Sequence, residues 1–271
     1  MKNGFLSLAV FVVLALFLAP MAAFAAGGTL YIEGDTTVGI SLGSNQSGVG
    51  WSWNEGSYTL TLTSTYPGDL IYFNTSDNIN LVYSGNVTIN ATGFQALVND
   101  TALVITGSGG TLTLKSDGGF PALSAGSLTI GGNAIIYAES NSTTVIEAKY
   151  GDLTIKDNAS VTVKGTGANS RGIYADSGSI TIDTTGVVNV TATGNGHALE
   201  ADDDIDIING TVRLIVANKD FAYDPSPNIT GGVVTVNGKT ITYSDSSGCN
   251  VGLGTLGVLA LAALVWGKRK K

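Results

Sequence analysis

A short apolar pattern recurs at a nearly constant spacing through the middle of this chain. The first residues of its successive copies lie 25, 25, 27 and 25 positions apart. The copies are Leu103-Val-Ile105, Leu128-Thr-Ile130, Leu153-Thr-Ile155, Ile180-Thr-Ile182 and Ile205-Asp-Ile207. A fixed period in this range is typical of a solenoid, because one repeat cannot bury its apolar face alone and stacks on its neighbours.

Each repeat also contains two further apolar runs. One follows the first run, at Leu112-Thr-Leu114, Ile135 to Tyr137, Val161-Thr-Val163, Val188-Asn-Val190 and Val212-Arg-Leu214. The other precedes the next repeat, at Leu123-Ser-Ala125, Ile146-Glu-Ala148, Ile173-Tyr-Ala175 and Leu199-Glu-Ala201. Alternating runs rich in Val, Ile and Thr, separated by Gly, Asn, Asp and Ser, predict three strands joined by tight turns.

The period and the strand pattern together select one architecture. A leucine-rich repeat needs its own leucine frame with a helical or irregular return, and a propeller blade needs roughly forty residues or more. We therefore predict an all-β fold, a parallel β-helix with three strands per coil and about six coils of roughly 25 residues. Parallel crossovers are almost always right-handed, so we expect a right-handed coil.

The segments that flank the repeats are predicted to close the solenoid. The β-helix is expected over residues 67–217, and residues 26–66, whose strands lack a clean period, are expected to form an amino-terminal cap and a first partial coil. Residues 218–245 are expected to form a carboxy-terminal cap. Within that cap, Asn237-Gly238 favours a type I′ turn and predicts a two-stranded hairpin.

Both ends of the chain carry targeting patterns. Residues 1–25 combine Lys2, an apolar run and Ala23-Phe24-Ala25, which predicts a secretory signal peptide. Residues 246–271 combine Ser247-Gly248-Cys249, an apolar stretch and a basic end. This tail resembles the Synergist-type carboxy-terminal sorting signals of bacterial surface proteins. The resemblance implies cleavage of the tail by an envelope protease and makes Cys249 a candidate for lipid attachment. An uncleaved transmembrane anchor is the alternative. We expect an exported protein held at the bacterial cell envelope.

The charge balance restricts the partners. Five of the 13 basic residues lie in the two terminal segments, so the eight that remain face 21 acidic residues, a net charge of about −13. Nucleic acid is excluded as a partner, because phosphate binding requires a basic surface. Divalent cations are favoured. The single Cys cannot form an internal disulfide, so packing and strand pairing must hold the fold.

One outward row of the predicted coils is a candidate binding site. The middle residue of each apolar run points outward. One such row is Thr129, Thr154, Thr181 and Asp206, and another is Ser124, Glu147, Tyr174 and Glu200. Adjacent members of a row lie about 4.8 Å apart, so the carboxylates of Glu147 and Glu200, two coils apart, are expected to be separated by roughly 10 Å. That separation is at the wide edge for an inverting glycosidase. The aromatic ring of Tyr174, flanked by the hydrogen-bond acceptors Glu147 and Glu200, is better suited to binding carbohydrate. The alternative is that this row is only a solvated face.

A turn near the last coils is a candidate calcium site. Its candidate ligands are Asp176, Asp202, Asp203, Asp204 and Asp206. Calcium prefers several carboxylate and carbonyl oxygens, which adjacent coils can supply together. The alternative is that these aspartates only solvate the turn.

The repeats as a whole resemble the carbohydrate-binding β-helix proteins found on the surfaces of anaerobic bacteria. The resemblance depends on Gly50-Trp51-Ser52-Trp53, Thr59 to Leu62, Gly126 to Ile130 and Gly151 to Ile155. It implies polysaccharide binding at a bacterial cell surface, with calcium as a cofactor. We expect the protein to be a monomer. Two other functions stay open, a structural or adhesive stalk without a glycan ligand, and a polysaccharide lyase or glycoside hydrolase.

Overall fold

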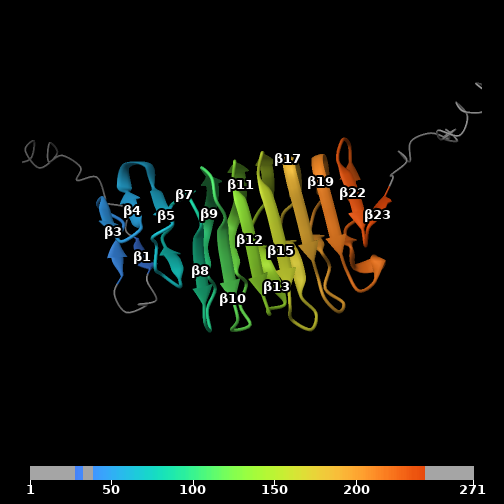
Figure 1. The fold of residues 1–271 in the computed structure, drawn as a ribbon, viewed down its shortest axis with the longest axis horizontal. Helices are drawn as coiled ribbons and strands as arrows, with labels where there is room; N and C mark the ends of the chain where they lie inside the picture. The colour runs from blue at the N-terminus through green and yellow to red at the C-terminus, as the bar shows by residue number, and fades with distance from the viewer. Residues whose placement is uncertain (1–27, 33–38, 242–271) are drawn as a thin grey trace, which may run out of the picture. The chain divides into compact units, whose positions relative to one another are not determined.

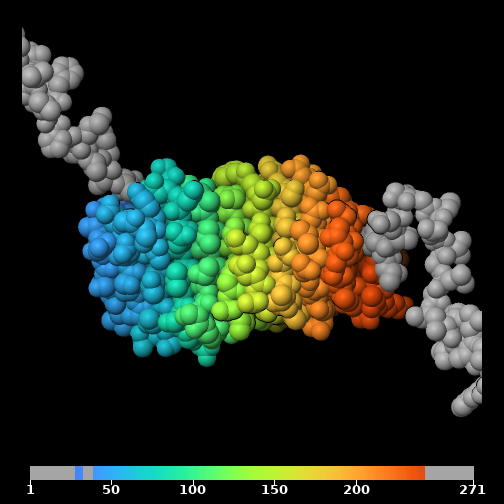
Figure 2. All heavy atoms as spheres, turned by 90° about the horizontal axis from the view of Figure 1, so that it is seen from above, coloured from blue at the N-terminus to red at the C-terminus, as the bar shows by residue number. Residues whose placement is uncertain are grey.

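A computed structural model describes residues 28–32 and 39–241. Strands dominate these residues and wind into a β-solenoid of about 7 turns. In Figure 1 the strands follow one another in chain order from β3 to β23. The bands of colour in Figure 2 succeed one another in the same way, so each coil packs mainly on its neighbours. The predicted parallel β-helix is confirmed.

The solenoid has three faces, and each coil contributes one strand to each face. Face 1 contains β5 (Thr59–Thr63), β7 (Ile79–Ser84), β14 (Leu153–Asp157), β21 (Asn228–Ile229), the second parts of β9 (Leu97–Gly107) and β11 (Leu123–Gly132), and the first parts of β17 (Ile180–Thr191) and β19 (Ile205–Ile215). Face 2 contains the second parts of β17 and β19 with β8 (Val87–Ala91), β10 (Leu112–Ser116), β12 (Ile135–Ser140), β15 (Ser160–Gly165) and β22 (Val233–Val236). Face 3 contains the first parts of β9 and β11 with β6 (Ile71–Asn74), β13 (Thr144–Ala148), β16 (Arg171–Ala175), β18 (Leu199–Ala201) and β20 (Tyr223–Asp224).

The first residues of the repeated apolar runs form an internal ladder on face 1. Leu128 pairs with Leu153, Leu153 with Ile180, and Ile180 with Ile205. All four side chains are buried. Burying a Leu or Ile side chain contributes about 1.5–3 kcal/mol, so repetition of this pattern supplies the main stabilisation of the solenoid.

Tyr83 adds a link between coils that are not neighbours. Its buried ring crosses Gly107, where a Cβ atom would lie 2.6 Å from the ring. Its hydroxyl donates to the Ile135 carbonyl at 2.8 Å and accepts a hydrogen bond from the Ile135 N–H. Burial raises the pKa of Tyr83, so the phenol stays protonated and can donate.

Antiparallel strands close the amino-terminal end. β3 (Gln46–Gly48), β4 (Trp51–Asn54) and β5 form a meander, joined by a 3₁₀ turn at Glu55–Ser57, and β5 then pairs in parallel with β7. β1 (Thr29–Ile32) lies antiparallel to β6 and to β2 (Ile40–Ser41). Trp53 is buried beneath this end and donates its indole N–H to the Leu42 carbonyl at 3.1 Å. The antiparallel strands thus cover the apolar edge of the first coil.

The carboxy-terminal end carries the predicted hairpin. β22 pairs in antiparallel fashion with β23 (Lys239–Ile241), and both residues of the turn, Asn237 and Gly238, have positive φ. β22 also pairs in parallel with β19, so the first strand of the hairpin is itself part of a coil. A 3₁₀ turn at Lys219–Phe221 precedes this last coil. Because these strands extend the three faces, the solenoid has about 7 turns, one more than the repeat spacing predicted.

The side chain of Asn237 completes the final pairing. Its amide donates to the Val216 carbonyl at 3.0 Å and accepts from the Val216 N–H at 3.0 Å. The side chain thereby makes the two hydrogen bonds that a further strand residue would make.

Candidate functional site

Face 3 carries a continuous outward row that runs along the solenoid. Its members, paired coil by coil, are Tyr72, Val98, Ser124, Glu147, Tyr174 and Glu200. The predicted register of Ser124, Glu147, Tyr174 and Glu200 is therefore confirmed, whereas a carbohydrate-binding role for these residues stays a prediction. Ser124 is buried, and its hydroxyl donates to a Glu147 carboxylate oxygen at 3.0 Å. We refer to this set as the face 3 row.

Two basic side chains gather around the Tyr174 end of the face 3 row. The Arg171 guanidinium lies 4.4 Å from the centre of the Tyr174 ring, and its Nε is 3.0 Å from a Glu200 oxygen. His197 Nδ1 lies 3.1 Å from the same oxygen. Glu200 therefore positions Arg171 over the aromatic ring. Sequence reasoning missed Arg171 and His197, because their contacts with Tyr174 and Glu200 depend on side-chain rotamers rather than on spacing.

The Tyr174 hydroxyl contacts an acidic side chain. It donates to Asp176 Oδ1 at 2.9 Å. Burial, the hydrogen bond to Asp176, and the charges of Asp176 and Asp202 together raise the pKa of Tyr174 to about 12, against the opposing effect of Arg171. The phenol is therefore neutral in the physiological range and serves as a hydrogen-bond group and an apolar surface rather than as a base.

The opposite end of the face 3 row opens into a hollow that the sequence did not predict. This aromatic hollow has a volume of about 490 Å³ and is lined by Tyr31, Leu70, Tyr72, Phe94, Gln95, Val98, Asp100 and Lys149. The rings of Tyr31 and Tyr72 stack with centres 5.7 Å apart and planes at 14°. Phe94 is 54% exposed, so a large apolar ring faces solvent at the rim of the hollow.

A charge pair spans the side of the aromatic hollow. Lys149 Nζ lies 3.0 Å from Asp100 Oδ1. The two residues are 49 positions apart, so the pair joins coils that are two turns apart. The hollow could not be predicted because Tyr31 comes from an antiparallel strand outside the repeat, where no period places it beside Tyr72.

The predicted calcium ligands make separate contacts. Asp176 accepts from Tyr174, and Asp206 accepts from the side-chain amide of Asn228 at 3.1 Å. Asp202, Asp203 and Asp204 have exposed side chains, and their backbone N–H groups bond to the preceding coil. Within residues 28–32 and 39–241, no three His, Cys, Asp or Glu side chains are arranged to hold a metal ion. The calcium site stays a prediction.

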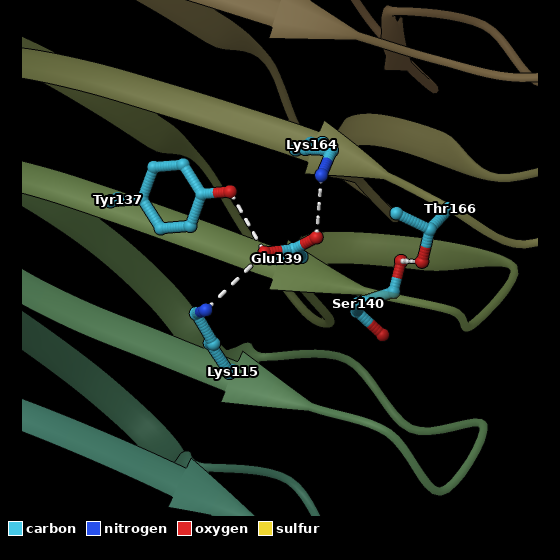
Figure 3. Close-up of polar contacts among 6 residues, drawn as sticks. All are labelled: Lys115, Tyr137, Glu139, Ser140, Lys164 and Thr166. Atoms are coloured by element: carbon cyan, nitrogen blue, oxygen red, sulfur yellow. Dashed lines mark hydrogen bonds and ion pairs between the residues drawn. The ribbon is translucent and has the colours of Figure 1, made fainter.

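Face 2 carries a second polar cluster, which Figure 3 shows. Glu139 lies between Lys164, with Nζ at 2.7 Å, and Lys115, with Nζ at 3.7 Å. The Tyr137 hydroxyl donates to Glu139 at 2.8 Å. The hydrogen bond from Lys164 is the main cause that lowers the pKa of Glu139. Burial, reinforced by Glu139, raises the pKa of Tyr137.

This cluster is best explained as a structural charge ladder. Lys115, Glu139 and Lys164 pair in register on three consecutive coils, so opposite charges alternate along the face. A hollow of about 250 Å³ beside it is lined by polar side chains. The sequence shows the spacing of 24 and 25 residues between these three charges, but each charge follows the apolar run of its strand and lies outside the pattern that predicted the outward rows.

The targeting predictions fall on other parts of the chain. Residues 1–25 and 246–271, including Ser247, Gly248 and Cys249, lie outside the described residues. Across the part of the chain that the structure describes, no helix is long and apolar enough to cross a membrane.

Comparison with protein families, with curated proteins and with solved structures found no match. The geometry of face 3 is therefore the basis for a functional proposal.

Proposed function

We propose that the outer surface of face 3 binds a polysaccharide. The observation that carries this proposal is the alignment of the aromatic hollow and Tyr174 on one row. Tyr72 and Tyr174 are separated by four coil steps, which correspond to about 19 Å. An extended sugar chain laid along the solenoid would contact both ends.

The chemistry of the face suits a sugar. Aromatic rings provide flat apolar surfaces for the faces of sugar rings, and the exposed ring of Phe94 together with the stacked Tyr31 and Tyr72 offers such surfaces. Glu147, Asp100 and Gln95 offer oxygens that can accept hydrogen bonds from sugar hydroxyls. Only a few polar groups are needed to fix orientation in a site that is otherwise apolar.

Binding experiments with matched variants would test the proposal. We expect the purified solenoid to be retained by at least one polysaccharide in pull-down assays and on a glycan array, with and without calcium. Tyr72→Ala and Phe94→Ala should weaken that retention at least tenfold. Tyr137→Ala, which removes a tyrosine from face 2, should leave it unchanged.

Each alternative function corresponds to a different outcome. If no glycan is retained, the polysaccharide proposal is rejected and a structural or adhesive stalk is favoured. Release of unsaturated or reducing sugars from a retained glycan would identify a lyase or hydrolase. Loss of binding in Tyr137→Ala together with the face 3 variants would place the ligand elsewhere.

We further propose that the protein acts outside the cell membrane, held to the envelope by residues 246–271. The support is the sequence pattern alone, an amino-terminal signal and an apolar carboxy-terminal stretch that ends in basic residues.

A further inference from the structure

An unusual number of asparagines in this chain begin the triplet Asn-x-Ser or Asn-x-Thr. The triplets number ten among 20 asparagines, and none has Pro in the middle. Ser and Thr occupy about a fifth of all positions, so about four such triplets would be expected by chance. The triplet is the acceptor pattern for N-linked glycosylation of exported proteins. Strands that keep polar residues on their outer face also generate this pattern, so burial and hydrogen bonding must decide which triplets can react.

Most of the triplet asparagines are accessible in the folded protein. Eight are exposed, namely Asn45, Asn74, Asn86, Asn90, Asn141, Asn158, Asn209 and Asn228. Asn189 is half-buried and Asn99 is fully buried. The fold therefore divides one sequence pattern into accessible and inaccessible members.

Asn45 and Asn86 present their side-chain nitrogens outward. The Asn86 Oδ1 accepts a hydrogen bond from the Thr111 N–H at 3.0 Å, and the Asn45 Oδ1 accepts one from the Glu55 N–H at 2.7 Å. In each case a backbone donor holds the carbonyl oxygen against the protein. The nitrogen on the other side of the amide is thereby directed away from that contact.

Asn99 has the opposite arrangement. Its nitrogen donates to the Thr101 hydroxyl at 3.0 Å and to the Ala102 carbonyl at 3.0 Å. Both amide hydrogens are used, the side chain is 0% exposed, and Thr101 is the hydroxyl residue of the same triplet. A glycan on this nitrogen could not be accommodated without opening the core.

We propose that Asn45 and Asn86 are N-glycosylation acceptors and that the fold excludes Asn99. The donor would be a lipid-linked oligosaccharide phosphate, used by a membrane transferase. The asparagine nitrogen forms a bond to the anomeric carbon of the sugar, the bond from that carbon to the phosphate oxygen breaks, one amide proton passes to a base of the transferase, and the lipid phosphate leaves. This proposal requires the expected export of the chain but is independent of any glycan-binding role.

The distribution of the triplets has a consequence for face 3. Among the described residues, no member of the face 3 row is a triplet asparagine. Asn74 ends β6, and Asn99, which follows Val98 in β9, is buried. Asn86 directly precedes β8 on face 2, and Asn90 lies within that strand. A glycan on Asn86 would therefore cover part of face 2 rather than the outer surface of face 3.

Glycopeptide mass spectrometry on the full chain, isolated from the cells that naturally make it, would test the proposal. We expect oligosaccharide mass additions on the peptides that contain Asn45 and Asn86, and an unmodified peptide for Asn99. Unmodified Asn45 and Asn86 peptides would overturn the assignment. Glycan on Asn99 at an occupancy similar to that of Asn86 would overturn the claim that the folded structure selects the sites.

Variants expressed in the same cells separate the triplet from the asparagine itself. Thr88→Ala retains Asn86 but removes its triplet, and we expect the intact mass to fall by one glycan. Thr88→Ser retains the triplet and should keep the glycan. Asn78→Gln changes an exposed asparagine outside any triplet and serves as the control. A glycan at Asn86 that persists in Thr88→Ala would contradict the proposal.

Discussion

The hydroxyl of Tyr83 donates a hydrogen bond to the carbonyl oxygen of Ile135, which lies 52 residues further along the chain. In a solenoid each coil normally contacts only the next, so stability is close to a sum of nearest-neighbour terms. This tyrosine connects two coils across an intervening one, and it does so through the space left by Gly107.

Removal of the Tyr83 hydroxyl should therefore destabilise the solenoid. Tyr83→Phe loses two hydrogen bonds to the backbone of Ile135, and we expect a loss of about 1–3 kcal/mol. Thermal or urea unfolding followed by circular dichroism would measure it. Tyr137→Phe is the matched control, because its hydroxyl bonds to a solvent-accessible carboxylate, and it should cost less. Equal losses of unfolding free energy in the two variants would show that the contact of Tyr83 with Ile135 contributes no more to stability than the surface hydrogen bond of Tyr137.

Gly107→Ala should be more harmful than an ordinary Gly-to-Ala change. The added Cβ would lie 2.6 Å from the Tyr83 ring, so the ring or the backbone must move. We expect a clear loss of melting temperature in the parent background and a smaller loss in a Tyr83→Ala background, where the ring is absent. A loss of the same size in both backgrounds would argue against a clash with Tyr83.

Ile155→Asp tests the inward ladder of face 1. Ile155 is fully buried, and a carboxylate there would lack partners, so we expect a loss of several kcal/mol or failure to fold. Thr154→Asp, at the adjacent outward position, should remain within about 1 kcal/mol of the parent. If the Ile155→Asp variant melted like the parent, the inward assignment would be wrong.

The Glu139 and Lys164 pair predicts a dependence of stability on pH. The hydrogen bond from Lys164 is the main reason why the pKa of Glu139 lies below its ordinary value of 4.5. A carboxyl group with a lowered pKa in the folded state stabilises the fold above the ordinary pKa, and this stability is lost as the pH falls through the lowered value. The melting temperature should therefore fall more steeply below about pH 4.5 for the parent than for Glu139→Gln. Parallel melting profiles for the two proteins would show that the pair contributes nothing.

Calcium and the envelope anchor stay open to direct tests. If the Asp202 turn binds calcium, the ion should raise the melting temperature relative to chelator, and an Asp202→Asn, Asp203→Asn double variant should lose that increment. Equal melting temperatures in calcium and in chelator would reject the calcium site.

The proposed envelope anchor can be tested by deletion. Removal of residues 251–271 should release a folded, soluble solenoid from the membrane fraction. Unchanged retention in that fraction would reject the anchor.

The sequence predicted what repeats and missed what does not. Leu128, Leu153 and Ile180 recur with the period of the coil, so their register and burial followed from spacing alone. The meeting of Tyr31 with Tyr72 depends on an antiparallel strand that no period describes. The placement of Arg171 over Tyr174 depends on side-chain rotamers and on the contact with Glu200, which spacing does not encode.

The amide of Asn237 has an evolutionary consequence. Its two hydrogen bonds to Val216 replace those of one peptide unit in a further strand. These contacts are local to the last coil, so they do not depend on the number of coils before it. Gene duplication could therefore insert or remove whole units between the two ends while each end keeps its own contacts. Relatives of this protein would then differ in length by multiples of one coil, and natural selection could change the reach of the molecule without changing how it begins or stops.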